Sequence, residues 1–231
     1  MQMTIKLRIL IKLNLLTAYA LIAANLIPLV GVMFFGWSLP LVMTLYWLEN
    51  VVIGFYTLAK MMVVTLSSGQ LSNLLQVAFF CVHYGIFCSV HGMILFDILN
   101  IEVTDLLKAE FILLHPQPLF EFLTTTFGDP LLLGLVALIL SHGFSMFEHF
   151  FQRGEKERLS FQVLMFSPYP RIIILHVAII GGAMLIETFG SPTYLLLVLV
   201  AVKIIMDVKL HLREHAKHEH VNNKAETTTQ D

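Results

Sequence analysis

Hydrophobic residues occur in six long runs along the chain, and short polar segments separate these runs. A helix needs about 20 mostly apolar residues to cross a lipid bilayer, which is roughly the length of each run. We therefore predict an all-α polytopic membrane protein built as a bundle of six transmembrane helices. The predicted spans are residues 10–35, 39–65, 74–98, 130–151, 170–189 and 193–212. Residues 1–212 then form the transmembrane domain, and residues 213–231 form a polar cytoplasmic tail.

The segments between the predicted spans are short, with one exception. Residues 99–127 hold several acidic side chains and two prolines, and we predict a loop with one short interfacial helix there. Residues 152–162 are predicted to form a polar loop. The first apolar run continues to Phe35, which is too long for the hydrophobic region of a cleaved signal peptide, so we interpret it as a retained span.

The composition favours a membrane protein. Hydrophobic residues make up 57% of the chain and charged residues 13%, with a mean hydropathy of +0.80. An average soluble domain is about half apolar and about one quarter charged. Cys81 and Cys88 lie on one predicted helix and are too far apart to bond within it, so no disulfide framework is predicted. Nothing in the sequence indicates nucleic-acid binding, and the predicted partner is the lipid bilayer.

Basic residues gather on one side of the predicted bundle. They flank the start of the first span, the end of the second, the loop between the fourth and fifth, and the end of the sixth. The long loop at residues 99–127 has Lys108 as its one lysine or arginine. Because cytoplasmic segments carry an excess of Lys and Arg, six spans with both termini cytoplasmic fit this distribution. The predicted location is the cell inner (plasma) membrane.

Polar and ionisable side chains lie inside several predicted spans. Such residues are costly in lipid, so they face other helices and often mark function. With a rise of about 1.5 Å per residue, Glu49, His83 and His142 fall at similar depth, which predicts a polar layer shared between helices. The candidate catalytic residues are Glu49, Ser141 and Lys203. The other candidate polar-core residues are Asn50, Lys60, His91 and Arg171.

Histidine and carboxylate side chains in this layer indicate a metal site. Asp207 and His211 are four residues apart and share a helix face. The predicted metal ligands are His83, His142, His176, Asp207 and His211, with Glu49 as a further ligand or a general base. Zinc or iron suits such ligands, and a metal-bound water would hydrolyse or transfer a lipid group. The leading hypothesis is a metal-dependent hydrolase or transferase acting on a lipid.

Several alternatives stay open. Haem is one, because His83 and His142 come from different spans at equal depth and would ligate one haem. A small transporter or proton relay is another, with Glu49, Lys203 and Asp207 as the charged path. A structural membrane protein without chemistry is the last. In that case each histidine forms a hydrogen bond between helices, and Glu49 and Lys203 form a buried ion pair.

Five blocks of the sequence resemble a known family. They are LYWLENVVIGFYTLAKM at 45–61, HYGIFCSVHGMILF at 83–96, LSHGFSMFEHF at 140–150, PYPRIIILHVAIIGG at 168–182 and KIIMDVKLHLREH at 203–215. In this order they resemble the prokaryotic membrane-protein family catalogued as domain of unknown function 6498, over nearly the whole chain. The resemblance implies functional positions at Glu49, Asn50, Lys60, His83, His91, Ser141, His142, Arg171, His176, Lys203, Asp207 and His211. The family carries no activity, so the resemblance supports the site and leaves the function open.

Overall fold

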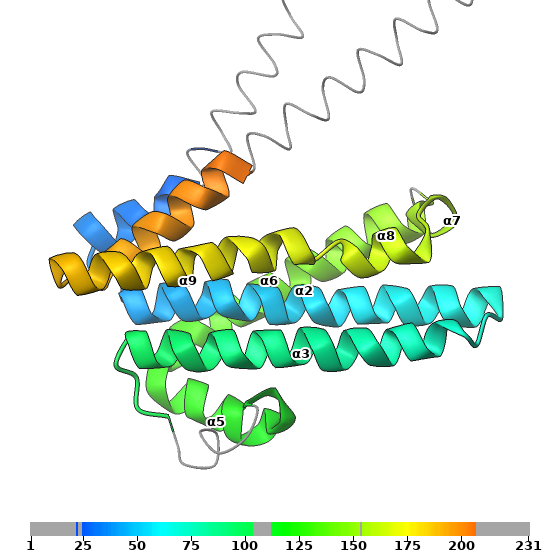
Figure 1. Ribbon diagram of the computed structural model, residues 1–231, viewed down its shortest axis with the longest axis horizontal. Helices are drawn as coiled ribbons and strands as arrows, with labels where there is room; N and C mark the ends of the chain where they lie inside the picture. Colours follow the sequence, from blue (N-terminus) through cyan, green and yellow to red (C-terminus); the bar gives the residue numbers. More distant parts are fainter. Residues whose placement is uncertain (1–21, 23–24, 104–111, 153, 207–231) are drawn as a thin grey trace, which may run out of the picture.

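The computed structural model of the chain describes residues 22, 25–103, 112–152 and 154–206, which contain helices and no strand (Figure 1). Four helical segments are long and apolar enough to cross a membrane: Leu39–Ser68, Asn73–Ile98, Asp129–Gln152 and Phe161–Phe189. They coincide with the four central predicted spans. Two shorter apolar helices, Asn25–Phe34 and Thr193–Met206, fall within the first and last predicted spans. The prediction of an all-helical protein with membrane-like helices is confirmed.

Helix α2, Leu39–Ser68, lies at the centre of the molecule, and local sequence sets both its ends. The Ser38 hydroxyl accepts a backbone N–H of the first turn, and Pro40 stands in that turn, where its missing donor has no cost. Gly69 ends the helix at φ 66°, a left-handed conformation that glycine adopts without strain. A short turn then leads into the antiparallel helix α3, Asn73–Ile98.

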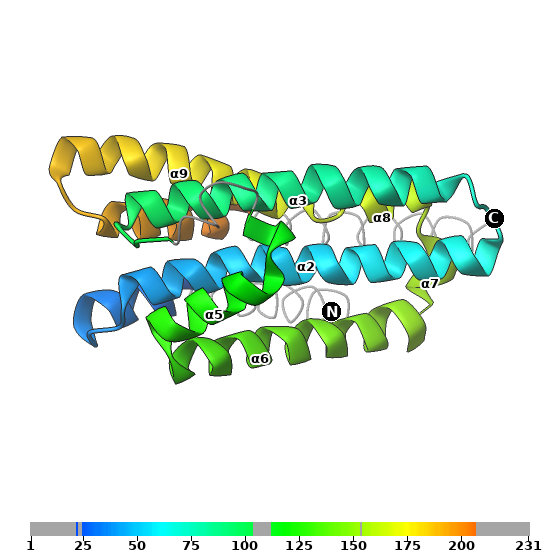
Figure 2. The ribbon, with the colours of Figure 1, turned by 90° about the horizontal axis from the view of Figure 1, so that it is seen from below.

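The remaining helices surround α2 and α3. They are η1 at Ile112–Leu114, α5 at Pro116–Phe127, α6 at Asp129–Ser145, the π-helical η2 at Met146–Gln152, α7 at Glu155–Arg158, α8 at Phe161–Phe166 and α9 at Tyr169–Phe189. Helices α3, α2 and α6 run side by side in Figure 2. Helix α9 packs on α2 and α3, and α5 packs on α6 and η1. Helices α3, α6, α8 and α9 all pack on α2, so the middle of α2 lies inside the bundle.

The segment between the fourth and fifth predicted spans is more helical than the polar loop that we predicted. It contains α7, and α8 already begins at Phe161. The Ser160 hydroxyl accepts the N–H of Val163 and so caps α8. Pro168 lies between α8 and α9 and has no backbone donor to continue a helix, and Pro170 stands in the first turn of α9, where that missing donor has no cost. In the long loop, α5 lies where one short helix was predicted, and its interfacial position stays a prediction.

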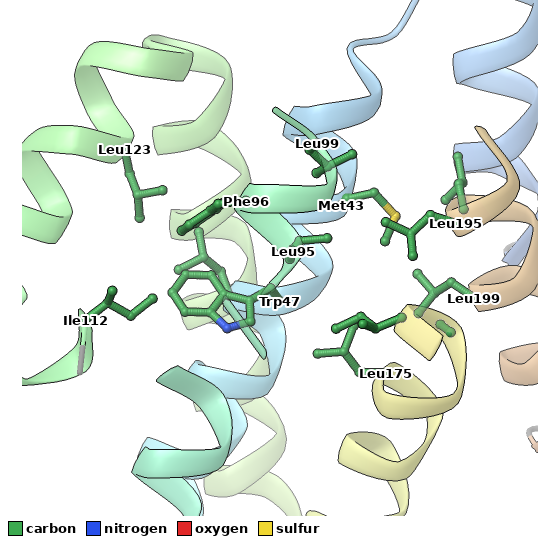
Figure 3. Packing of buried hydrophobic residues seen from close by; sticks show 14 of the residues in the cluster. Met43, Trp47, Leu95, Phe96, Leu99, Ile112, Leu123, Leu175, Leu195 and Leu199 are labelled. Atoms are coloured by element: carbon green, nitrogen blue, oxygen red, sulfur yellow. The ribbon is translucent and has the colours of Figure 1, made fainter. Parts of the chain in front are cut away.

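The core is built around Trp47 of α2, which is fully buried. Its indole N–H donates to the Cys88 carbonyl on α3 at 2.8 Å, and its ring meets Phe96 edge to face at 5.5 Å between centroids. Figure 3 shows the same core continuing through Met43 to Leu195, which lies on the Thr193–Met206 helix. That helix follows α9, so the core ties together segments from both ends of the described chain.

Large apolar side chains also cover the outside of the long helices. Phe55, Leu75, Leu133 and Ile173 are each more than half exposed, and they come from four different membrane-like segments. A soluble monomer rarely exposes contiguous apolar surface of this extent. These helices therefore have an exposed apolar surface of the kind that membrane-spanning helices present to lipid.

Candidate functional site

The carboxylate of Glu49, in the middle of α2, meets basic side chains from three other helices. Arg171 of α9 donates from Nη1 to Glu49 Oε1 at 2.8 Å. Lys203 of the Thr193–Met206 helix has its Nζ 3.7 Å from Oε2. His142 of α6 has its Nε2 3.7 Å from Oε1. We call these four residues the Glu49 cluster, and they join four helices at one carboxylate.

Tyr46 supports the cluster from one turn earlier on α2. Residues three apart on a helix lie on the same face, so the Tyr46 ring and the Glu49 carboxylate face the same neighbours. Lys203 Nζ lies 4.8 Å from the centroid of that ring, a cation–π distance. The sequence analysis did not single out Tyr46, although its position three residues before Glu49 is a readable signal.

The cluster carries more positive than negative charge. Arg171 and Lys203 each bring one positive charge when protonated, and Glu49 brings one negative charge. The Glu49 side chain is 19% exposed, whereas the Arg171 side chain is 49% exposed. An unmatched charge is costly away from water. An anionic group beside Arg171 and Lys203 would therefore be stabilised, and Arg171 is accessible enough to meet it.

An apolar groove ends at the cluster. It has a volume of about 440 Å³ and lies between the Asn25–Phe34 helix, α2 and α6. Its walls include the apolar side chains of Pro28, Val42 and Leu138, together with Glu49 and the candidate catalytic Ser141. We call this space the α2–α6 groove. It offers an apolar surface and a charged end, which is the arrangement that an amphiphilic ligand requires.

A second, smaller space lies where α9 and the Thr193–Met206 helix meet α2. This cavity has a volume of about 30 Å³ and is walled by Tyr46, Glu49, Asn50, Ile174, Leu175, Leu199, Arg171 and Lys203. Tyr46 and Glu49 also line the α2–α6 groove. These two side chains therefore stand between the groove and the cavity.

Asn50 is buried at the wall of the small cavity. Its Nδ2 donates to the Tyr46 carbonyl at 2.9 Å, one turn earlier. Its Oδ1 is shielded from solvent and accepts no hydrogen bond within the described part of the chain. The Asn50 carbonyl in turn accepts from the hydroxyl of Tyr84 on α3 at 2.9 Å. The amide is thus fixed in place with one acceptor atom unused.

The other histidines of the predicted polar layer have partners of their own. His91 of α3 has its Nε2 2.8 Å from Nδ1 of His176 on α9. His83 of α3 has its Nδ1 3.1 Å from the hydroxyl of Tyr169 at the start of α9. Lys60 lies away from the Glu49 cluster, with its Nζ 5.3 Å from the ring centroid of Phe150. The structure therefore places His142, Arg171 and Lys203 at Glu49, and His83, His91 and Lys60 elsewhere.

The predicted metal site is only partly within the described chain. Asp207 and His211 lie outside the described residues. Among the residues that are described, no group of three or more His, Cys, Asp or Glu side chains is arranged to hold a metal ion. His83, His142 and His176 each contact a different partner. The zinc or iron site and the haem alternative stay predictions.

The helices and the cluster together define a class: a helical protein whose membrane-like apolar helices meet at a partly exposed ionic cluster. The chain belongs to a family of unknown function, DUF6498, whose model matches residues 10–224. No curated protein and no solved structure gives a significant match to the chain. The predicted family is confirmed. Because the function of this family is unknown, we infer a function from the geometry of the site.

Proposed function

We propose that this chain is a multi-pass membrane protein that binds an anionic lipid. The anionic headgroup lies beside Arg171 and Lys203 of the Glu49 cluster, and the acyl chain lies in the α2–α6 groove. The observation that carries the proposal is that an apolar groove of about 440 Å³ reaches Glu49, whose carboxylate is contacted by the positive charges of Arg171 and Lys203 from the far side of the groove wall. Ligand sites of this kind are mostly apolar, with a few placed polar groups, and measure about 300–1,000 Å³.

Charge complementarity supports an anionic rather than a cationic headgroup. Arg and Lys both bind phosphate and carboxylate oxygens, and Arg does so through two N–H groups at once. One Arg171 nitrogen bonds Glu49. The half-exposed guanidinium keeps other donors available to a phosphodiester at the mouth of the site. Lys203 adds a second positive charge on the opposite carboxylate oxygen.

The lipid ligand is shared with the leading hypothesis from the sequence. A hydrolase or transferase acting on a lipid needs such a headgroup site, and His142 beside Glu49 is a candidate acid–base pair. Ser141 lies on the groove wall as a candidate nucleophile. Metal ligation by Asp207 and His211 stays a prediction from the sequence.

The proposal includes six spans, with both termini in the cytoplasm and the chain in the inner membrane. Its support is the distribution of Lys and Arg along the sequence, together with the short apolar helices Asn25–Phe34 and Thr193–Met206. Reporter fusions placed after residues 70, 115, 158 and 191 test it. Cytoplasmic signals after 70 and 158, with external signals after 115 and 191, are expected; the reverse pattern contradicts it.

Lipid binding is tested by native mass spectrometry of the purified full chain in mild detergent. The probes are dioleoyl-phosphatidylpropanol, which is anionic, and dioleoyl-phosphatidylcholine, which has no net charge. We expect a preference for the anionic lipid on the order of tenfold, because a hydrogen bond to a charged group contributes about 1.5–3 kcal/mol. Equal retention of the two lipids by the wild-type chain would overturn the proposal.

Matched variants locate the binding site. Lys203→Met and Arg171→Gln each remove a positive charge from the Glu49 cluster and should reduce the preference for the anionic lipid. Lys60→Met removes the same charge elsewhere on the bundle and serves as the control. An equal loss of preference in Lys60→Met and Lys203→Met would mean that general surface charge, and not this site, attracts the lipid.

A further inference from the structure

The small cavity beside Glu49 has room for one small polar group. Its volume is about 30 Å³, and a water-sized group needs roughly 10–15 Å³ on this measure. The cavity lies on the α9 side of Tyr46 and Glu49, where Arg171 and Lys203 also form its wall. It is too small for a phosphate together with its ester groups, so it suits the end of a headgroup and not its centre.

Asn50 lines the cavity and has an acceptor atom that is unused. The residue is 7% exposed, and its Oδ1 is buried without a donor among the residues that the structure describes. Its Nδ2 is already engaged with the Tyr46 carbonyl, which fixes the orientation of the amide. A buried acceptor without a donor is unfavourable, so a group that donates a hydrogen bond to Oδ1 would be bound favourably.

Lys203 offers the same cavity donors. An ammonium group has three N–H donors. Lys203 Nζ lies 3.7 Å from Glu49 Oε2 and over the Tyr46 ring, and neither contact is a short hydrogen bond. Two residues that line the cavity therefore have complementary capacity: Asn50 has an unused acceptor, and Lys203 has N–H donors beyond its ion pair with Glu49.

A hydroxyl group meets both needs, because it donates one hydrogen bond and accepts others. A phosphate or carboxylate oxygen cannot donate to Asn50, and a quaternary or primary ammonium cannot accept from Lys203. We propose that this cavity is a hydroxyl subsite: it binds a headgroup hydroxyl of the anionic lipid between Asn50 Oδ1 and Lys203 Nζ. This inference rests on the proposed lipid binding and specifies the headgroup as an anionic polyol phosphodiester.

Two lipids that differ only in hydroxyl groups test the subsite. Dioleoyl-phosphatidylglycerol and dioleoyl-phosphatidylpropanol have the same charge and the same three-carbon headgroup, but the second has no free hydroxyl. In competition on the wild-type chain, phosphatidylglycerol should be retained about fivefold better, the effect of one neutral hydrogen bond. Equal retention would mean that water fills the cavity, and it would overturn the subsite.

Variants assign the preference to Asn50. Asn50→Leu has similar volume and no acceptor, and it should bind both lipids equally. Thr44→Val is the control, since Thr44 also has a buried, unpartnered oxygen on α2 but does not line the cavity. A fivefold preference that survives in Asn50→Leu contradicts the assignment. If Asn50→Leu does not fold, the two-lipid comparison on the wild-type chain still decides the proposal.

The two proposals fail in different ways. If phosphatidylpropanol is retained no better than phosphatidylcholine, the anionic-lipid site itself is wrong. If phosphatidylpropanol is preferred over phosphatidylcholine but phosphatidylglycerol has no advantage over phosphatidylpropanol, the lipid site holds and the hydroxyl subsite is wrong.

Discussion

Nε2 of His91 lies 2.8 Å from Nδ1 of His176, so one hydrogen bond between two imidazoles joins α3 to α9 inside the bundle. His91 is 4% exposed, and its other ring nitrogen lies 2.6 Å from the Phe87 carbonyl of the preceding turn. A carbonyl only accepts, so His91 Nδ1 carries a proton. Neutral His91 must then accept at Nε2, which makes His176 Nδ1 the donor.

The first prediction concerns these tautomers. Both neutral rings should be protonated at Nδ1 and bare at Nε2, because the Phe87 carbonyl fixes His91 and His91 fixes His176. ¹⁵N spectra of histidine-labelled chain in detergent report the protonated nitrogen of each ring, and His176→Asn assigns the signals. An Nε2-protonated neutral ring at either position would contradict the hydrogen-bond chain.

The second prediction concerns the stability that this pair provides. His176→Leu leaves the buried His91 Nε2 without a donor, which should lower the free energy of unfolding by about 1–3 kcal/mol. His176→Asn should recover most of that loss, because its amide N–H stands close to where Nδ1 stands. Unfolding by SDS in mixed micelles measures the free energy of unfolding of both variants.

His149 provides the control for this pair, since its Nδ1 contacts the Ser145 carbonyl on the preceding turn of its own helical segment. His149→Leu should change the free energy of unfolding by less than His176→Leu. If the two leucine variants were equally destabilised, the contact between α3 and α9 would have no special role.

The third prediction concerns Glu49. Glu49→Gln leaves Arg171 and Lys203 without their carboxylate, and it should lower the free energy of unfolding by about 1–3 kcal/mol. Replacing the lysine as well, in Glu49→Gln/Lys203→Met, should restore part of the stability, because it removes one unmatched buried charge. A double variant that is as unstable as the sum of the two single variants would show that the charges do not interact.

The fourth prediction concerns close packing at Gly92 of α3. A Cβ at this position would lie 2.7 Å from Trp47 Cε2 and from Ile112 Cδ1. Trp47 is fully buried, so it cannot move away without disturbing the core. Gly92→Ala should therefore lower the free energy of unfolding by about 1–3 kcal/mol.

Gly85 lies two turns earlier on the same helix and serves as the control. A Cβ there would meet nothing within 4 Å in the described structure. Gly85→Ala should raise the free energy of unfolding by up to about 1 kcal/mol, because alanine favours a helix more than glycine does. In SDS unfolding, the change in the free energy of unfolding should be negative for Gly92→Ala and positive for Gly85→Ala. Changes of the same sign would contradict the packing of Trp47 on Gly92.

The helices were predictable from hydropathy, but the contacts of the polar residues were less so. The apolar runs place α2, α3, α6 and α9 within a few residues, because each needs a span-length apolar surface. The sequence also offered Glu49 and Lys203 as an ion pair, and the structure places them 3.7 Å apart. The convergence of Arg171 on the same carboxylate depends on the order of helices around the bundle, which periodicity does not encode.

The partners of the histidines were also not predictable from the sequence. Similar depth suggested that His83 and His142 belong to one polar layer, yet His83 meets Tyr169 and His142 meets Glu49. Depth follows from residue number, whereas the partner depends on the rotation of each helix and on its neighbour. The short helix α8 was missed for a local reason: the serine cap at Ser160 begins it just before the end of the predicted polar loop, and it continues into apolar residues that no predicted span included.

The position of Glu49 on the second long helix has a consequence for the order in which the chain is made. Synthesis proceeds from the N-terminus, so α2 enters the membrane before His142, Arg171 and Lys203 exist. During that interval its carboxylate lacks these three partners, and an ionised group without them is costly in lipid. A chain that stops before α6 would keep this unpaired acid, and a cell could use it to recognise an unfinished copy. Synthesis of the Thr193–Met206 helix, which brings Lys203, completes the set of basic partners around this acid.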